Sequence, residues 1–159
     1  MSSIRILTVF VLSMCVVACG EPRRSYHGGE SGMTVTDPPD VHLSGDRITI
    51  DDHIRFALDS DEILSESDQL LDHIAQFLGN HPEITSLSLV GHTDESGGHE
   101  HNQDLSQRRA AAVQAALEQR GVRQPIDSRG AGETEPLCDE DTDACHAQNR
   151  RVEFLVQLQ

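Results

Sequence analysis

Apolar and polar residues alternate, or repeat at helical spacing, along most of the chain. Arg47–Ile50 and His53–Phe56 alternate with a period of two, which predicts an initial strand or a short hairpin. The same alternation predicts a strand over Ile84–Val90 and a last strand over Arg150–Leu158. A short strand or turn is expected at 125–130.

Two segments between these strands have apolar residues at helical spacing. The first starts at Ser65, which is followed three residues later by Asp68 as in a capping box, and it should end near Gly79. Its apolar stripe consists of Leu70, Leu71, Ile74, Phe77 and Leu78. The second helix should end at Arg120, with Gly121 as its C-terminal cap. Strands interleaved with helices predict an α/β (α+β) sandwich, with a mixed sheet covered by helices on one face.

The second helix carries a charged residue within its apolar stripe. At 100° per residue, Arg109 lies on the same face as Leu105 and Val113. A buried guanidinium cannot lose its proton and needs an anion, and Asp94 on the preceding loop is a nearby candidate. The two could form a structural salt bridge. They could also bracket a zwitterion, the carboxylate binding an ammonium and the guanidinium a carboxylate.

Three separated motifs resemble the OmpA C-terminal domain family. They are G-H-T-D-x-x-G at Gly91–Gly97, N-x-x-L-S-x-x-R-A at Asn102–Ala110, and N-R-R-V at Asn149–Val152. The resemblance extends from about Arg47 to Leu158. It implies a βαβαβ domain that binds peptidoglycan non-covalently, through the diaminopimelate residue of the stem peptide.

The resemblance also implies roles for individual residues. Asp94 would receive the ammonium of diaminopimelate and Arg109 its carboxylate, while Asn102 and its neighbours shape the pocket. Asp59 follows the first strand, where a turn or capping role is equally expected. Arg150 borders the pocket in the family pattern, and a structural ion pair is its alternative. The expected site residues are therefore Asp94, Arg109, Asn102, Thr93, Leu105, Asp59 and Arg150.

The N-terminus predicts export and lipidation. Residues 1–18 have the features of a signal peptide, with Arg5 before an apolar run, Ile6–Val17, that is too short for an ordinary membrane span. The run closes with V-V-A-C, which resembles a bacterial lipobox and would make Cys19 the lipid-bearing first residue of the mature protein. An ordinary signal peptide cleaved nearby is the alternative. Gly20, in place of Asp after the cysteine, favours the outer membrane, with the domain facing the periplasm.

The next segment lacks any sustained hydrophobic period. It is rich in Gly and Pro, and we expect residues 19–46 to form a lipidated N-terminus and flexible tether. The folded domain is then expected over residues 47–159.

Charge narrows the range of partners. The formal net charge is −15, and all 12 basic residues are arginines. Nucleic acid is excluded as a partner because no basic stripe is available to displace counterions from phosphates. Affinity for the anionic cell wall must therefore come from a local, shaped pocket.

Cys138 and Cys145 enclose a strongly acidic segment. A disulfide is favoured because exported proteins enter an oxidising compartment. A metal site is the alternative, formed by the two thiolates with His146 or by oxygens of the acidic residues. The spacing matches neither a zinc knuckle nor an EF-hand loop.

Two other functions remain open at this point. His92, His99 and His101 flank Asp94 and could form a metal cluster, even a hydrolytic one. No H-E-x-x-H or G-x-S-x-G motif accompanies them, so we expect a binding protein without catalytic residues, metal or cofactor. The resemblance also permits a protein-interaction module that binds Tol-type envelope proteins.

Overall fold

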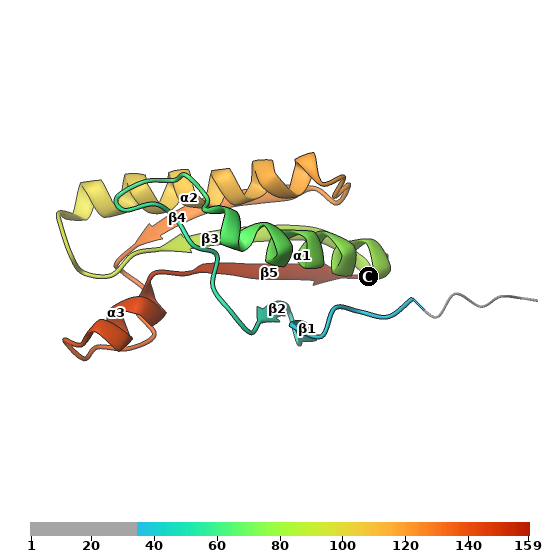
Figure 1. Ribbon diagram of the computed structural model, residues 1–159, viewed down its shortest axis with the longest axis horizontal. Coiled ribbons are helices and arrows are strands. Elements are labelled where there is room, and N and C mark those ends of the chain that lie inside the picture. Colours follow the sequence, from blue (N-terminus) through green and yellow to red (C-terminus); the bar gives the residue numbers. More distant parts are fainter. Residues whose placement is uncertain (1–34) are drawn as a thin grey trace, which may run out of the picture. The chain divides into compact units, whose positions relative to one another are not determined.

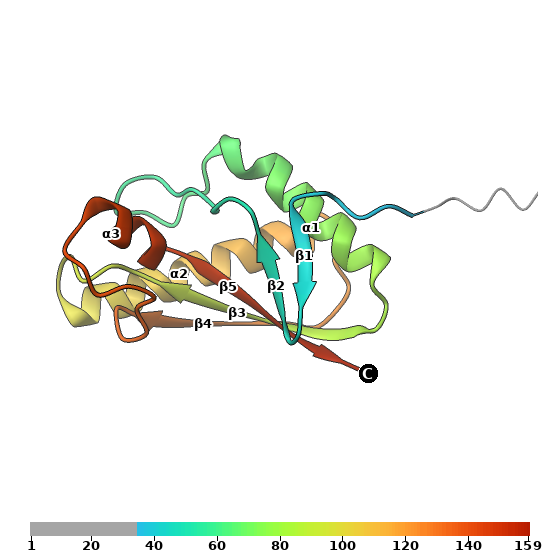
Figure 2. The same ribbon diagram turned by 90° about the horizontal axis from the view of Figure 1, so that it is seen from below.

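Five strands form one mixed sheet in the order β1-β2-β5-β3-β4, in which only β3 and β4 run parallel. The strands are β1 (Val41–Ser44), β2 (Arg47–Ile50), β3 (Ile84–His92), β4 (Ile126–Gly132) and β5 (Val152–Leu158). The helices are η1 (Ser65–Ser67), α1 (Asp68–Asn80), α2 (His99–Gln119) and α3 (Asp143–Asn149). The two long helices α1 and α2 lie on one face of the sheet, and α3 lies at one end of it (Figure 1, Figure 2). The predicted mixed sheet with helices on one face is confirmed.

The computed structural model describes residues 35–159. The predicted signal peptide, Cys19 and the first part of the predicted tether lie outside this range. Within residues 35–159, no helix is long and apolar enough to cross a membrane. The described residues form one compact unit that contains every strand and helix named above. A chain that starts at Gly20 therefore retains all the described structure.

The sheet begins at Val41, inside the stretch predicted as tether. Ser44 pairs with Arg47, so only Gly45 and Asp46 connect β1 to β2. Gly45 has a φ of +63°, which a two-residue hairpin turn requires at that position. Val41 is buried against the core, which an unstructured tether could not achieve.

The segment His53–Phe56, predicted as a strand, runs outside the sheet. Phe56 alone forms a single bridge, to Ile63. The Arg55 amide donates to Ser67 Oγ at 2.8 Å. The capping box predicted at Ser65 and Asp68 does not form, because Ser65 begins the 3-10 turn η1 and Ser67 takes the N-cap position of α1. Ser67 makes no side-chain cap hydrogen bond, since its Oγ accepts from Arg55.

The core lies between the sheet and the two long helices. Its most buried side chains are Leu71, Ile74 and Leu78 of α1, Val113 and Leu117 of α2, Leu87 and Leu89 of β3, and Phe154 of β5. Each such side chain contributes about 1.5–3 kcal/mol relative to exposure. The second helix ends as predicted: Gly121 has a φ of +87°, and the Val122 amide donates to the Leu117 carbonyl at 3.2 Å.

Helix α2 packs closely against β3 and β4 at two glycines. A Cβ on Gly91 would overlap the carbonyl oxygen of Ser106, and one on Gly130 would lie 2.5 Å from the Gln107 amide nitrogen. This packing places the C-terminal end of β3 beside the first half of α2. The two parts of the chain that carry the expected site residues are thereby brought together.

The acidic segment contains a helix that the sequence pattern did not predict. Thr142 caps α3, its Oγ1 accepting from the Cys145 amide at 3.2 Å. Cys138 and Cys145 form a disulfide, as predicted. Because both sulfurs are bonded to each other, the alternative metal site with two thiolate ligands is wrong.

Candidate ligand-binding site

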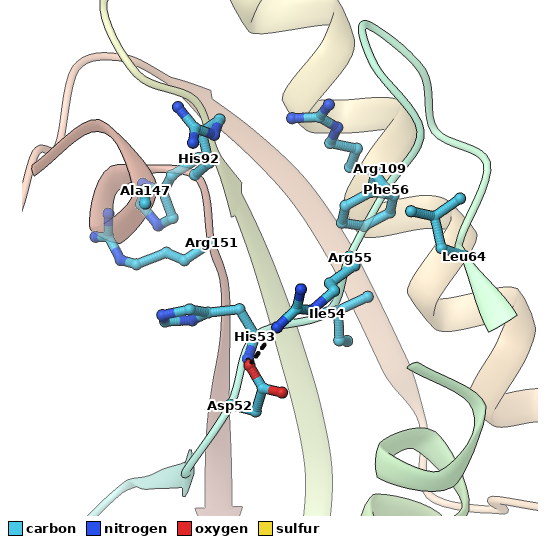
Figure 3. A pocket seen from close by; sticks show the side chains of 11 residues that line it. Asp52, His53, Ile54, Arg55, Phe56, Leu64, His92, Arg109, Ala147 and Arg151 are labelled. Atoms are coloured by element: carbon cyan, nitrogen blue, oxygen red, sulfur yellow. Dashed lines mark hydrogen bonds and ion pairs between the residues drawn. The ribbon is translucent and has the colours of Figure 1, made fainter. Parts of the chain in front are cut away.

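A pocket of about 440 Å³ opens beside the C-terminal end of β3. In Figure 3, Arg109 and Phe56 lie on one side, and His92, Ala147 and Arg151 lie on the other. Its walls come from the segment after β2, from α2, and from the junction between α3 and β5. The lining residues are Asp52, His53, Ile54, Arg55, Phe56, Leu64, His92, Arg109, Ala147, Arg150 and Arg151.

The pocket is locally cationic. Four arginines line it against a single acid, Asp52, although the whole chain carries a net charge of −15. The pocket therefore favours a ligand with at least one anionic group.

Arg109 is the most distinctive residue of this pocket. It is only 9% exposed, its Nε donates to the Ser60 carbonyl at 2.9 Å, and its guanidinium carbon lies 5.0 Å from the centre of the Phe56 ring. Burial and the neighbouring Arg150 lower the pKa of Arg109, but a guanidinium stays charged at physiological pH. Among residues 35–159, no carboxylate forms an ion pair with it.

The structural salt bridge between Asp94 and Arg109, one of the two alternatives drawn from the sequence, does not form. Asp94 Oδ2 instead accepts from Arg150 Nη1 at 2.6 Å, and Oδ1 accepts from the Ser96 amide at 3.0 Å. Burial raises the pKa of Asp94, but the hydrogen bonds from Arg150 and Ser96 outweigh burial and leave the pKa below its usual value. Asp94 is thus a charged, buried acid that does not itself line the pocket but is hydrogen-bonded to Arg150, which does.

Three further predicted residues are buried and do not line the pocket. Asn102 is buried, and its Nδ2 donates to the Asp94 carbonyl at 3.3 Å. Leu105 is buried in α2. Thr93 is buried, its amide donates to the Gly132 carbonyl at 2.9 Å, and its side chain lines a separate, smaller cavity.

Asp59 lies in a turn, outside the pocket. It is exposed, has a φ of +52°, and accepts from His101 Nε2 at 2.7 Å. The Ser60 amide donates to the Ala57 carbonyl at 3.2 Å across the same turn. This geometry matches the turn role, which was one of the two expectations for Asp59.

Sequence reasoning missed one wall of the pocket. His53, Arg55, Phe56 and Leu64 belong to the connection between β2 and η1. The alternation of polar and apolar residues over His53–Phe56 predicted a strand in this connection. The contact that makes it a pocket wall is the one between Phe56 and Arg109, which are far apart in the sequence. No pattern within the connection itself indicates that contact.

The histidine cluster proposed as a metal site does not form. His92 is buried, and neither ring nitrogen has a hydrogen-bond partner in residues 35–159. His99 bonds to Glu133 at 2.9 Å, while His101 bonds to Asp59. Their donor atoms do not converge, so the hydrolytic metal cluster has no support from the described residues.

Comparison with known proteins agrees with the fold and the motifs. The family model described as the OmpA family matches residues 55–150. The peptidoglycan-associated lipoprotein of Brucella melitensis is 34% identical over 145 residues, which cover 89% of this chain and 84% of that protein. The outer-membrane lipoprotein YfiB of Pseudomonas aeruginosa is 32% identical over 139 residues, covering 76% and 82% respectively.

A solved structure shows the same architecture. The crystal structure of the peptidoglycan-associated lipoprotein from Burkholderia pseudomallei superposes with a TM-score of 0.59 at 34% identity, covering 65% of this chain and 88% of that one. Sequence motifs, sheet order and relatives all agree. This chain belongs to the OmpA family.

Proposed function

We propose that this domain binds peptidoglycan non-covalently, through the diaminopimelate residue of the stem peptide. The names of its relatives, peptidoglycan-associated and outer-membrane lipoproteins, support an attachment role in the cell envelope. The observation that carries the proposal is the buried Arg109 guanidinium, which lines the pocket without an ion-pair partner among residues 35–159. Such a charge favours an anionic ligand group.

Arg109 would bind the carboxylate of the ligand. Its Nε is held by the Ser60 carbonyl and its face by Phe56, so the terminal nitrogens remain for a forked pair of hydrogen bonds. Because the side chain is already ordered, little rotamer entropy is lost on binding. Arg150, at the junction between α3 and β5, also lines the pocket and would add to its positive potential.

Asp94 would receive the ammonium group. A carboxylate has about four lone-pair sites, and the Ser96 amide and Arg150 use two of them. The lowered pKa keeps Asp94 charged at neutral pH. Asn102 would hold the Asp94 backbone in place through its 3.3 Å hydrogen bond. The action proposed is recognition of a zwitterion and not turnover.

We further propose that the protein is anchored in the outer membrane through Cys19. Lipid on Cys19 would hold the protein in the outer membrane, because several acyl chains give stable attachment where one does not. The residues between Cys19 and Val35 would act as a tether that spans up to roughly 50 Å when extended, since Asp37 and Asp40 are already hydrogen-bonded to Asn80 and His73 of α1. The protein would then connect the outer membrane to the wall from the periplasmic side.

The decisive experiment is co-sedimentation of the Gly20–Gln159 form with purified cell-wall sacculi of diaminopimelate type and of lysine type. We expect binding to the diaminopimelate wall only. Arg109→Gln should weaken it roughly tenfold to a hundredfold, since a charge-assisted hydrogen-bond pair is lost. Arg108→Gln, next to it on α2, is the matched control, because Arg108 pairs with Asp104 and Asp61 and does not line the pocket.

Asp94→Asn should also reduce binding, because the amide cannot neutralise an ammonium. Circular dichroism must show that each variant is folded, since Asp94→Asn leaves the Arg150 guanidinium without its partner. Equal sedimentation with both wall types, or full binding by folded Arg109→Gln protein, would overturn the proposal.

A further inference from the structure

A second, smaller cavity of about 90 Å³ lies between the end of β3 and the disulfide-closed acidic segment. Its lining differs from that of the cationic pocket. Glu95, Glu133, Asp139 and Glu140 face it together with His146, and no arginine does. The cavity is large enough for an ion and a water molecule, because one water occupies about 30 Å³.

Three buried polar atoms at this cavity have no hydrogen-bond partner among residues 35–159. They are His146 Nε2, Glu133 Oε2 and Thr93 Oγ1. Thr93 is itself only 4% exposed. Buried polar atoms in folded proteins nearly always have a partner in the protein or in bound water, so three unsatisfied atoms around one cavity indicate that it holds water or an ion.

The donor atoms nearest one another have the spacing of a metal site. His146 Nε2 lies 3.5 Å from Asp141 Oδ1 and 3.9 Å from Glu95 Oε1, and all three donors lie within 4.8 Å of one another. A tetrahedral zinc ion with bonds of about 2.0–2.1 Å holds its ligands about 3.4 Å apart. Glu95 and Asp141 are exposed side chains, so a small rotation would close the remaining difference.

Local structure holds the backbone segment that carries two of these ligands. The Cys138–Cys145 disulfide and the Thr142 cap hold the segment that carries Asp141 and His146. The His146 amide donates to the Thr142 carbonyl at 2.9 Å, which holds the His146 backbone in the first turn of α3. Zinc accepts both histidine nitrogen and carboxylate oxygen as ligands in four-coordinate sites, whereas calcium takes six to eight oxygen ligands.

We propose that Glu95, Asp141 and His146 bind one Zn²⁺ ion, with water in the remaining position. The ion would cross-link the loop after β3 to the acidic segment and would neutralise two carboxylates there. Because Glu95 follows Asp94 directly, the cross-link would also restrain the loop that carries Asp94. The zinc site does not depend on the proposed peptidoglycan binding.

The test is a calorimetric titration of ZnCl₂ into metal-stripped Gly20–Gln159 protein. The protein should be exported so that the disulfide forms, and it should carry no histidine tag. We expect one zinc per chain, with a rise in melting temperature on saturation. His146→Gln and Glu95→Gln should each weaken zinc binding at least about tenfold. Loss of a residue that only orients a metal ligand already costs about tenfold to a hundredfold in affinity, and loss of a ligand itself should cost no less.

Asp143→Asn is the matched control, because it removes one charge from the same segment at an exposed position outside the cavity. This variant should bind zinc as the wild type does, and excess CaCl₂ should not compete. The proposal is overturned if the wild type shows no saturable binding, or if folded His146→Gln protein binds equally well. Equal weakening by Asp143→Asn would also overturn it, since binding would then reflect only the diffuse acidic charge.

Discussion

His92 is a buried histidine at the wall of the cationic pocket. Its side chain is 1% exposed, and the nearest acid, Glu153, lies 3.6 Å from Nε2. Burial, reinforced by the charge of Arg151, lowers the pKa of His92 to about 4. The folded protein therefore holds this ring neutral at neutral and mildly acidic pH.

The low pKa of His92 predicts a loss of stability in mild acid. An unfolded histidine takes up a proton below about pH 6.5, whereas His92 in the folded state does so only near pH 4. The unfolded state therefore binds more protons between these values, and stability falls as the pH falls. We expect a contribution of about 2–3 kcal/mol between pH 6.5 and 4.5.

Urea unfolding at these two pH values can isolate the contribution. His92→Phe keeps a ring of similar shape and removes both unsatisfied nitrogens. The loss of unfolding free energy between pH 6.5 and 4.5 should therefore be smaller in this variant than in the wild type, by about 2–3 kcal/mol. An identical pH dependence in wild type and variant would show that His92 is not the group responsible.

At the scale of elements, the site depends on close packing of α2 against the sheet, with the backbone of the helix near the backbone of β3 and β4. Gly91 on β3 and Gly130 on β4 leave the space that the Ser106–Gln107 turn of α2 occupies. Asn102 and Arg109 lie on either side of this contact along α2. The position of Arg109 relative to Asp94 therefore depends on how closely the helix approaches the strand.

Gly91→Ala should separate α2 from β3. The added methyl group would overlap a backbone carbonyl, which cannot rotate away as a side chain could, and we expect a loss of about 3 kcal/mol in unfolding free energy. Gly79→Ala, in α1, is the matched control because its Cβ meets no atom within 4 Å. That change should stabilise the protein by about 0.5–1 kcal/mol. Chemical denaturation measures both variants, and a neutral Gly91→Ala would contradict the close packing.

At the scale of the whole molecule, the net charge is strongly negative, whereas positive side chains gather at one pocket. A chain with a net charge of −15 concentrates four arginines around one pocket. The long-range field should repel an anionic wall, while the pocket attracts anionic groups at short range. The Debye length falls from about 30 Å at 0.01 M salt to about 8 Å at 0.15 M. Salt therefore weakens the long-range repulsion more than the short-range attraction in the pocket.

If the domain binds the wall as proposed, association should become faster when salt is raised over this range. Surface plasmon resonance with immobilised diaminopimelate-containing wall fragments would measure the rate. A protein that relied on a broad basic surface would show the opposite trend. A rate that falls steeply with salt would therefore contradict a local pocket on an acidic surface.

The sequence alone determined those features that depend on neighbours along the chain. The alternation over Ile84–Val90, the apolar stripe of α2 with Arg109 in it, and the glycine cap at Gly121 were all predicted, and all are present. The Cys138–Cys145 pair was also predicted, because export and short separation together favour a disulfide. Local periodicity is sufficient for such features, since each depends on side-chain spacing within one element.

Only the tertiary structure decided which charges meet. Asp94 has two nearby arginines, and the route of the chain from α3 into β5 gives it Arg150, while Arg109 contacts Phe56. The grouping of Glu95 with His146 likewise depends on how the disulfide segment folds back toward β3. These contacts join residues more than 50 positions apart, and no periodicity within either segment records them.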